Sequence, residues 1–462
     1  MKGFKRLLGW TISSLVLAVL ALMFASWVSP PELIRVAAGY TAKIVCSNVF
    51  LAGRDPAEVL ATDVQAPGHP LLKLMRVDVD GERGVVRAGL LGIIGRGRAV
   101  ARPHVGCAVV SDGKQDGARL GRVPVPTHAA DESGAVPALQ KIIGDDTLAG
   151  PGMRAIVVVQ DGRVVAERYA GGFAASVPQL GWSMTKSVTA GLIGILVKDG
   201  RLKLDQPAGW TAGDGRRRIT IADLLSMSSG LEFNESYGAV SDVTRMLYLE
   251  SDMAAFAGAK PLVHPVGRVW SYSSGTAVIL SRIFQNAAGP DAIEFVQSRL
   301  FDPLGMTSAV METDARGTLV GSSYMYATPR DWARYGQLLV QDGVWEGREI
   351  LPRGYVAMMG SPATASGGEY GQAMVWRWVT HSDTPGENPD AAFGIPADAF
   401  WMAGHDGQYV AVIPSRRLVV VRMGLTPVRE HYRPEPLVRS LLDATATAAA
   451  TAAATTGRSG LL

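Results

Sequence analysis

Strand-like segments at both ends of a long helical stretch are the feature that most limits what this chain can fold into. Residues 154–159 and 163–169 are rich in β-formers and are joined by the turn-forming pair Asp161-Gly162, which predicts a hairpin. Three more strand-like runs come far later, at residues 401–403, 409–414 and 418–423. Between the two groups, up to about residue 345, the spacing of apolar residues is mostly helical. This order predicts an α/β protein of the α+β type, in which helices flank one antiparallel sheet built from distant segments and an all-helical lobe is inserted.

The first 29 residues differ from the rest. Lys2, Lys5 and Arg6 precede residues 7–28, which contain no charged side chain. This run matches the ~20 residues that cross a bilayer as a helix. Its basic flank predicts a single-pass protein of the inner membrane, with the bulk of the chain on the periplasmic side. A cleavable signal peptide, which would release the protein into the periplasm, is the alternative. We expect a retained anchor because the run lacks a good small-x-small cleavage site.

The remainder of the chain divides into three parts by composition. Residues 30–135 predict an appended strand-rich segment, because glycines separate its apolar runs at 71–79 and 84–100. Residues 140–442 contain the strands and helices described above and form the main domain. The Ala/Thr-rich residues 443–462 predict a disordered tail.

Composition and missing motifs exclude several classes of partner and site. Cys46 and Cys107 could pair in an oxidising compartment or remain buried free thiols, and they do not make a zinc site. The net charge is only +3, without a dense basic run after the first few residues, which argues against a nucleic-acid partner. Neither the Gly-x-Ser-x-Gly motif of α/β-hydrolases nor the His-Glu-x-x-His motif of zinc proteases occurs.

The first element with chemical meaning is Ser183-Met184-Thr185-Lys186. A spacing of three places Ser183 and Lys186 on one face of a helix, and the apolar residues up to Val197 predict that helix. A serine hydroxyl needs a nearby base, and lysine can serve only when it is neutral. Burial at a helix N-terminus would lower the lysine pKa in that direction. The same letters in Ser111-Asp112-Gly113-Lys114 lie in a turn with no apolar run behind them, so we expect no aligned pair there.

Two later elements add a proton donor and a close strand edge. Tyr272, in Ser271-Tyr272-Ser273-Ser274-Gly275, could pass a proton to a leaving group and later activate the hydrolytic water, although most tyrosines only pack. The second element is Gly404-His405-Asp406-Gly407-Gln408, on or beside a late strand. A strand edge with glycine lets the backbone approach a substrate closely. One N–H of this strand and the N–H of Ser183 could therefore form an oxyanion hole.

In this order, the three elements resemble the serine β-lactamase-like hydrolases. This family includes class C β-lactamases, DD-peptidases, family VIII esterases and 6-aminohexanoate-dimer hydrolases. The resemblance covers roughly residues 140 to 440 and includes four accessory stretches, at residues 200–205, 219–231, 301–306 and 328–331. It implies an acyl-enzyme mechanism that needs neither a metal nor an organic cofactor.

Carried over residue by residue, the resemblance implies Ser183 as the nucleophile, Lys186 as its base and Tyr272 as the tyrosine of a Tyr-x-Asn motif. His405-Asp406-Gly407 would replace the usual Lys-Thr-Gly, so that His405 and Gly407 would contact the substrate. Gln408 would donate the second oxyanion N–H, beside that of Ser183.

Two residues depart from the β-lactamase pattern. Ser274 stands where those enzymes usually have asparagine, and His405 stands where they usually have lysine. A lysine can bind the carboxylate of a β-lactam as a permanent cation, whereas histidine is mostly neutral at pH 7. Both residues are similar to the esterase and 6-aminohexanoate-dimer hydrolase branch. There Tyr237, in the loop 232–240, would correspond to a substrate-contacting tyrosine, and we expect Ser274 to line the substrate site as well.

We therefore expect a membrane-anchored serine hydrolase that cleaves a small amide or ester through a Ser183 acyl-enzyme. A penicillin-binding DD-peptidase or a β-lactamase, which would use the same residues, is the first alternative. A non-catalytic binding protein at the membrane is the second.

Overall fold

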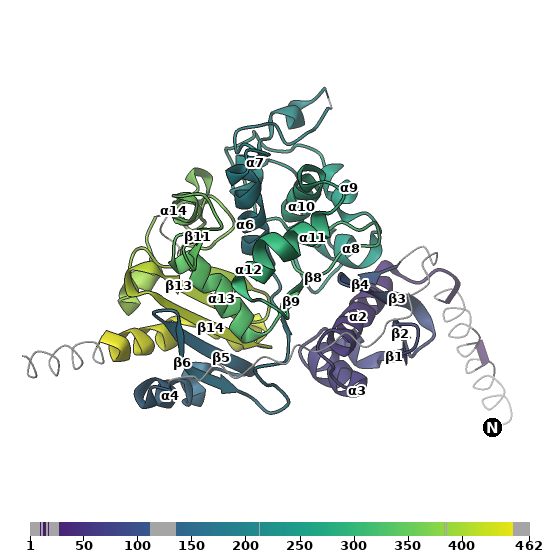
Figure 1. The fold of residues 1–462 in the computed structure, drawn as a ribbon. Helices are drawn as coiled ribbons and strands as arrows, with labels where there is room; N and C mark the ends of the chain where they lie inside the picture. The colour runs from purple at the N-terminus through teal and green to yellow at the C-terminus, as the bar shows by residue number, and fades with distance from the viewer. Residues whose placement is uncertain are drawn as a thin grey trace, which may run out of the picture.

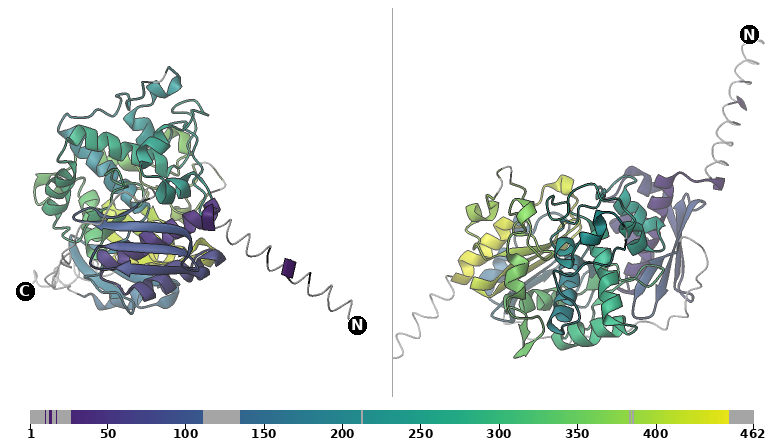
Figure 2. Two further views of the ribbon diagram at one scale, coloured as in Figure 1. Left: turned by 90° about the vertical axis from the view of Figure 1, so that its right-hand side faces the viewer. Right: turned by 90° about the horizontal axis from the view of Figure 1, so that it is seen from above.

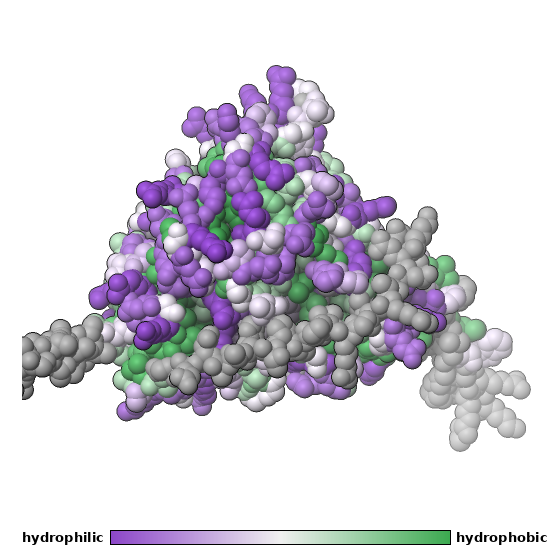
Figure 3. All heavy atoms as spheres, in the orientation of Figure 1, coloured by the Kyte–Doolittle hydropathy of each residue, from purple (hydrophilic) through white to green (hydrophobic). Residues whose placement is uncertain are grey.

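The computed structural model describes residues 10, 13–14, 17, 27–110, 135–211, 213–382, 384 and 386–446. Residues 135–446, called the catalytic domain below, combine a central sheet, helices on both of its faces and a helical lobe (Figure 1). Residues 27–110, called the N-terminal module, lie against one side of this domain (Figure 1). Hydrophilic side chains cover most of the visible surface of the helical lobe (Figure 3).

The central sheet has five antiparallel strands in the order β12-β13-β14-β5-β6. The strands are β5 (Met153–Gln160), β6 (Arg163–Tyr169), β12 (Phe400–Gly404), β13 (Gln408–Ile413) and β14 (Leu418–Gly424). Val419 of β14 pairs with Val159 of β5, so the C-terminal strands continue the sheet begun by the early hairpin. The prediction of one antiparallel sheet built from distant segments is confirmed.

Helices bury both faces of this sheet. They are α4 (Pro137–Ile143), α5 (Asp146–Ala149), α6 (Met184–Lys198), α13 (Pro329–Val340) and a helix at residues 435–446. Successive strand residues point to opposite faces. Val157 therefore joins the large core that contains α6 and α13, whereas Val158 joins a smaller core with α4 and the helix at 435–446. Because both faces are covered, these strands are almost continuously apolar rather than alternating.

The helical lobe fills the sequence between the two groups of strands. It contains α7 (Ile221–Leu225), α8 (Asp242–Leu249), α9 (Met253–Gly258), α10 (Ser274–Ala288), α11 (Ala292–Val296) and α12 (Asp302–Leu304). A small sheet in the order β7-β9-β8 joins the lobe to the central sheet; its strands are β7 (Gln179–Leu180), β8 (Val310–Met311) and β9 (Met325–Ala327). The remaining elements are β10 (Val344–Trp345), β11 (Arg348–Glu349) and α14 (Tyr355–Gly360).

In the N-terminal module the long helix α2 (Glu32–Phe50) packs on a four-stranded antiparallel sheet, and shorter helices follow it. The module also contains α3 (Pro56–Val59), β1 (Met75–Asp80), β2 (Val85–Leu90), β3 (Ile94–Arg102) and β4 (Gly106–Val109). Figure 2 shows the four strands in front, with α2 behind them and facing the catalytic domain. Gly39 of α2 permits a close crossing with α8, because a Cβ there would lie 2.6 Å from the carbonyl oxygen of Tyr248.

Two features of the module differ from the sequence prediction. The apolar run at residues 71–79 begins in a 3-10 helix, Pro70–Leu74, and only its later part belongs to strand β1, which begins at Met75. Proline fixes φ near the helical value and favours the first position of a helical turn. Helix α2 was not expected from the strand-like composition. Its residues 36–48 are buried nearly all round, apart from Tyr40, so the polar stripe that marks an amphipathic helix is missing.

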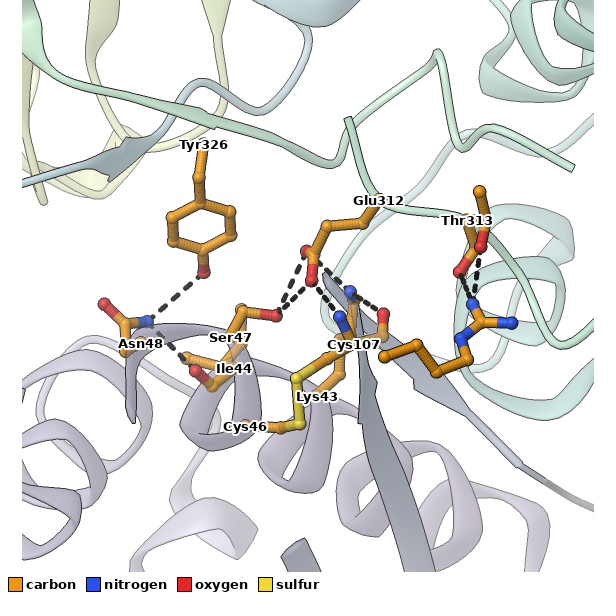
Figure 4. The surroundings of a disulfide bond; sticks show 10 residues. Lys43, Ile44, Cys46, Ser47, Asn48, Cys107, Glu312, Thr313 and Tyr326 are labelled. Carbon is orange, nitrogen blue, oxygen red and sulfur yellow. Dashed lines mark hydrogen bonds and ion pairs between the residues drawn. A yellow bond between two sulfur atoms is a disulfide. The ribbon is translucent and has the colours of Figure 1, made fainter. Parts of the chain in front are cut away.

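A disulfide joins Cys46 of α2 to Cys107 of β4, which resolves the alternative that the sequence left open. Beside it, Glu312 of the catalytic domain enters the module, as Figure 4 shows. The carboxylate of Glu312 lies 2.6 Å from the Lys43 Nζ and accepts hydrogen bonds from Ser47 Oγ, at 2.9 Å, and from the backbone N–H of Cys107. The module is thus held to the catalytic domain by a buried charged group as well as by apolar packing.

The two ends of the chain lie partly outside the described residues. The predicted anchor at residues 1–29 lies almost wholly outside the described residues, and it stays a prediction. Among the residues that the structure does describe, no helix has the length and apolarity to span a membrane. The C-terminal helix continues through residues 443–446, where the predicted tail begins, and residues 447–462 lie outside the described ranges.

Candidate active site

Ser183 lies at the start of α6, directly after a constrained turn. Trp182 has a φ of +48°, a conformation that is costly for a bulky residue. A Cβ on Gly181 would lie 2.1 Å from the Trp332 ring, so only glycine fits there. Ser183 occupies the N-cap position, yet its side chain makes no capping hydrogen bond. Its hydroxyl is therefore available for chemistry instead of being engaged by the helix.

Lys186 lies one turn further along α6 and reaches back to that hydroxyl. Its Nζ is 2.9 Å from Ser183 Oγ, 3.0 Å from Ser274 Oγ and 2.9 Å from the carbonyl oxygen of Ser322. The side chain is 1% exposed, and burial lowers its pKa to about 8, with the carboxylate of Glu235 acting in the opposite direction. A lysine with this pKa is neutral in a useful fraction of molecules near neutral pH, as a general base must be.

Tyr272 lies just before α10, next to the side chains of Ser183 and Lys186. The Lys186 Nζ lies 4.7 Å from the centre of its ring. Burial raises the pKa of Tyr272, Glu235 raises it further, and a hydrogen bond with the Ser183 side chain acts the other way. The phenol thus keeps its proton at neutral pH and can donate it. Behind Tyr272 lie three aromatic residues, Trp270, Tyr370 and Trp376, with ring centres 5.3 to 6.4 Å from its own; we call these four the aromatic group.

Ser274 lies in the buried part of the site, next to Lys186. It is the first residue of α10, it is fully buried, and its hydroxyl lies between Lys186 and Glu235. Ser274 Oγ donates to Glu235 Oε1 at 2.5 Å, and the backbone N–H of Ser274 donates to Glu235 Oε2 at 2.8 Å. Ser274 therefore bridges a lysine and a carboxylate, and its predicted contact with the substrate stays a prediction.

Glu235 and the carbonyl of Ser322 are members of the site that the sequence did not indicate. Glu235 lies in the loop 232–240, and burial raises its pKa while Lys186 and Ser274 lower it. The only sequence signal was its place two residues before Tyr237. A glutamate in a polar loop is otherwise indistinguishable from a solvated one. The Ser322 carbonyl comes from the turn before β9, and a backbone acceptor leaves no trace in a side-chain pattern.

Tyr237 and His405 meet beside the nucleophile. Their rings stack with centres 4.7 Å apart and planes 25° apart, and the His405 ring lies edge-on to Trp182 at 5.6 Å. A hydrogen bond links the side chains of Tyr237 and Ser274. The two predicted substrate-binding residues, one from the loop 232–240 and one from the end of β12, thus form a single aromatic wall next to Ser183.

The turn between β12 and β13 brings a strand edge close to the nucleophile. A Cβ on Gly404 would lie 2.2 Å from the carbonyl oxygen of Gly181, so the close approach expected for this strand is present. Gln408 pairs with Gly404, and its side chain bonds Gly424 and the carbonyls of His405 and Asp406, which fixes the turn.

Gly407 is buried within this turn. It has a φ of +83°, and a Cβ there would lie 2.6 Å from the Arg422 guanidinium. Gly407 shapes the turn, and its part in substrate binding stays a prediction. As for metals, no three His, Cys, Asp or Glu side chains lie close enough to hold an ion in the part of the chain that the structure describes.

Known proteins are similar to this chain over most of the catalytic domain. A family model described as β-lactamase matches residues 145–444, and the N-terminal module lies outside that match. The 6-aminohexanoate-dimer hydrolase of Paenarthrobacter ureafaciens is 25% identical over 266 residues, which are 52% of this chain and 67% of that protein.

Two solved structures show the same fold. A Bacillus anthracis protein, provisionally described as a 6-aminohexanoate-dimer hydrolase, has a TM-score of 0.54 at 23% identity and covers 66% of this chain and 81% of its own. A Bacteroides dorei protein, provisionally described as a β-lactamase, has a TM-score of 0.53 at 22% identity, with coverages of 67% and 98%. At these identities the likeness establishes architecture, while the chemistry must be argued from the site itself.

Proposed function

The chain belongs to the β-lactamase family of serine hydrolases, and from this premise we propose that it cleaves a small amide or ester through an acyl-enzyme at Ser183. One observation carries the proposal. The Ser183 hydroxyl, which caps no backbone group, is 2.9 Å from a buried lysine whose pKa is lowered to about 8. A nucleophile within hydrogen-bond reach of a base, with the base oriented by further groups, is the arrangement that acyl transfer requires.

In the proposed acylation, the neutral Lys186 amine takes the Ser183 proton while Oγ bonds to the substrate carbonyl carbon. The carbonyl π electrons move to the oxygen and give a tetrahedral intermediate. When this collapses, the bond to the leaving amine or alcohol breaks, and the leaving group takes the Tyr272 proton. The proton held by Lys186 then returns to Tyr272. Its raised pKa supports a donor role for Tyr272, because the phenol carries its proton when the leaving group needs it.

Deacylation reverses these roles. A water molecule attacks the acyl carbon while its proton passes by way of the Tyr272 hydroxyl to the neutral Lys186 amine. When this second tetrahedral intermediate collapses, the bond from the acyl carbon to Ser183 Oγ breaks, and Oγ takes the proton back from Lys186. The backbone N–H groups of Ser183 and Gln408 are the proposed oxyanion donors. The support for Gln408 is the close approach of Gly404, its strand partner, to the residues before Ser183. Fixed donors of this kind stabilise the charge that develops in the transition state.

We favour linear amides or esters over β-lactams as substrates. At position 405 the site has a histidine that is stacked on Tyr237, where a β-lactamase would hold a permanent cation. Position 274 has a serine where β-lactamases usually have asparagine, so it has no side-chain amide that could bind a lactam side chain. The Ser274 hydroxyl is buried against Glu235. The relative from Paenarthrobacter ureafaciens is named for the dimer of 6-aminohexanoate, which is consistent with an amide substrate.

We further propose that the catalytic domain lies on the periplasmic side of the inner membrane, held there by residues 1–29. The Cys46–Cys107 disulfide supports this placement, because structural disulfides persist mainly in oxidising compartments.

The test is hydrolysis of p-nitrophenyl butyrate by the full chain and by its Ser183→Ala variant. Ser111→Ala is the matched control, because it removes the serine of the other Ser-x-x-Lys sequence. We expect turnover to vanish in Ser183→Ala and to be unchanged in Ser111→Ala. Equal rates in wild type and Ser183→Ala would overturn the proposal. Durable labelling of Ser183 by a fluorescent penicillin would instead favour a DD-peptidase.

A further inference from the structure

A cavity of about 420 Å³ lies between the N-terminal module and the catalytic domain. On the module side, α2 contributes Leu33, Val36 and Ala37, and the segment after it contributes Leu71 and Leu72. The opposite side is formed by the loop around Tyr237, by α8 and by residues 427–429. The module side belongs to a part of the chain that the family match does not include, so this cavity is an addition to the family fold.

Aliphatic and aromatic side chains make up most of the cavity lining, which also includes His69, His405, Asp406 and Arg429, and several of the polar side chains are bonded to the protein. Tyr40 donates its hydroxyl hydrogen to the carbonyl of Asp63, and Tyr248 accepts one from Tyr324. Thr244 donates to the carbonyl of Ala239, and Arg429 donates to the carbonyl of Pro67, which joins the module to the C-terminal segment. A ligand in this space would thus meet mostly aliphatic and aromatic surface, and the favoured ligand is an apolar chain.

Three residues connect this cavity to the reaction centre. Trp182, Tyr237 and His405 all line it; the first directly precedes the nucleophile and the other two form the wall beside it. The cavity also adjoins the oxyanion turn, since Asp406 contributes to its lining. The aromatic group around Tyr272 lies elsewhere and is not part of the lining. Ser183 and Lys186 do not line the cavity either, so it adjoins the reaction centre through Trp182, Tyr237 and His405. Since the proposed donor to the leaving group, Tyr272, lies outside it, we assign the cavity to the acyl side of the scissile bond.

We propose that this cavity is the acyl-chain subsite of the Ser183 reaction and that the N-terminal module sets the acyl specificity. The substrate class is an ester or amide whose acyl part is a linear aliphatic chain of medium length. This inference rests on the proposed function. The module is fixed in place by the buried contacts of Glu312 with Lys43 and Ser47, so the wall it supplies is preformed rather than recruited by the substrate.

The first test is the dependence of kcat/KM on acyl length, with p-nitrophenyl acetate, butyrate, hexanoate and octanoate. Each buried methylene is worth about a fourfold gain in affinity for an apolar site. We expect wild-type kcat/KM to rise at least tenfold from butyrate to octanoate. A flat or falling profile, with Ser183-dependent hydrolysis of acetate intact, overturns the subsite and leaves the proposed function standing.

Two variants fill the cavity from opposite sides. Leu33→Trp acts from α2, and Ala239→Trp acts from the exposed loop, where a large residue puts folding at little risk. Both should abolish the gain from butyrate to octanoate and keep acetate hydrolysis within twofold of wild type. The matched control is Arg35→Trp, an exposed residue of α2 that does not line this cavity, and it should keep the wild-type profile. An unchanged profile in both cavity variants, each with a wild-type Tm, overturns the inference.

A binding measurement separates the two proposals. Calorimetric titration of the Ser183→Ala chain with octanamide needs no turnover. We expect at least tenfold tighter binding than in the Ser183→Ala/Leu33→Trp double variant, and equal binding in both contradicts the subsite. If Ser183→Ala hydrolyses every ester as fast as wild type, the proposed function fails, and the acyl role of the cavity fails with it.

Discussion

Among the described residues two lysines are buried, one in the N-terminal module and one in the catalytic domain, and their surroundings differ. Lys43 lies in α2 at the junction with the catalytic domain, and Lys186 lies in α6 beside the nucleophile. Burial lowers the pKa of each to about 8. Lys43, however, is 2.6 Å from the carboxylate of Glu312, whereas the atoms that Lys186 contacts directly are hydroxyl and carbonyl oxygens.

The difference shows that a lowered pKa does not identify a catalytic lysine. Structural ion pairs also perturb pKa values, so the inference needs a contact that chemistry can use. Lys186 has such a contact in Ser183, and its nearby carboxylate, Glu235, is separated from it by Ser274. Lys43 is neutralised directly and has no nucleophile among its contacts with Glu312 and the Cys107 carbonyl. The following variants test this contrast.

The largest effect is expected at Lys186. Lys186→Met should lower kcat on p-nitrophenyl butyrate by about 10²–10⁴-fold, since a general base contributes that much. The protein should remain folded, because the variant also removes the cost of burying an amine. Lys43→Met is the control, and its folded molecules should keep kcat within a few-fold of wild type. Near-normal turnover by Lys186→Met at neutral pH would show that Lys186 is not the base.

A large change in stability is expected at the junction. Glu312→Ala leaves the Lys43 amine buried without its carboxylate, and breaking a buried pair in this way costs about 3–5 kcal/mol. The free energy of unfolding in urea should fall by that amount, while Glu32→Ala, which breaks the exposed pair with Arg245, should cost less than about 1 kcal/mol. Equal losses in the two variants would mean that the junction does not depend on this contact.

The pH dependence of the reaction should depend on Glu235, the carboxylate near Lys186. If neutral Lys186 is the base, as proposed, kcat/KM should increase as pH rises through about 8. Glu235 raises the pKa of Lys186, so Glu235→Gln should move the midpoint of this increase to lower pH. Glu232→Gln, in the exposed part of the same loop, should leave the midpoint where it is. A midpoint that stays fixed or rises in Glu235→Gln would contradict the assigned role.

The same contrast explains what the sequence could predict. Ser183 and Lys186 are three residues apart, so helix geometry alone aligns them, and the strands of the sheet follow from their apolar runs. Glu235 meets Ser274 across 39 residues, and α2 is buried by partners that a single sequence does not reveal. The acyl-side cavity was still harder to predict from the sequence, because two parts of the chain that share no motif form it. Local chemistry was thus predictable, and the contacts that tune it were not.

The smallest effect on activity is expected at His405, a predicted substrate-binding residue that also lines the cavity. His405 stacks on Tyr237 and lies edge-on to Trp182, and aromatic pairs of this kind contribute about 0.5–1.5 kcal/mol. His405→Ala should therefore change the ratio of kcat/KM for octanoate to that for acetate by a few-fold, with both esters still hydrolysed. His264→Ala, an exposed histidine outside the site, is the control. Complete loss of turnover on every ester in His405→Ala would mean that His405 acts in the chemistry itself, and that the turn carrying it does more than shape the acyl side.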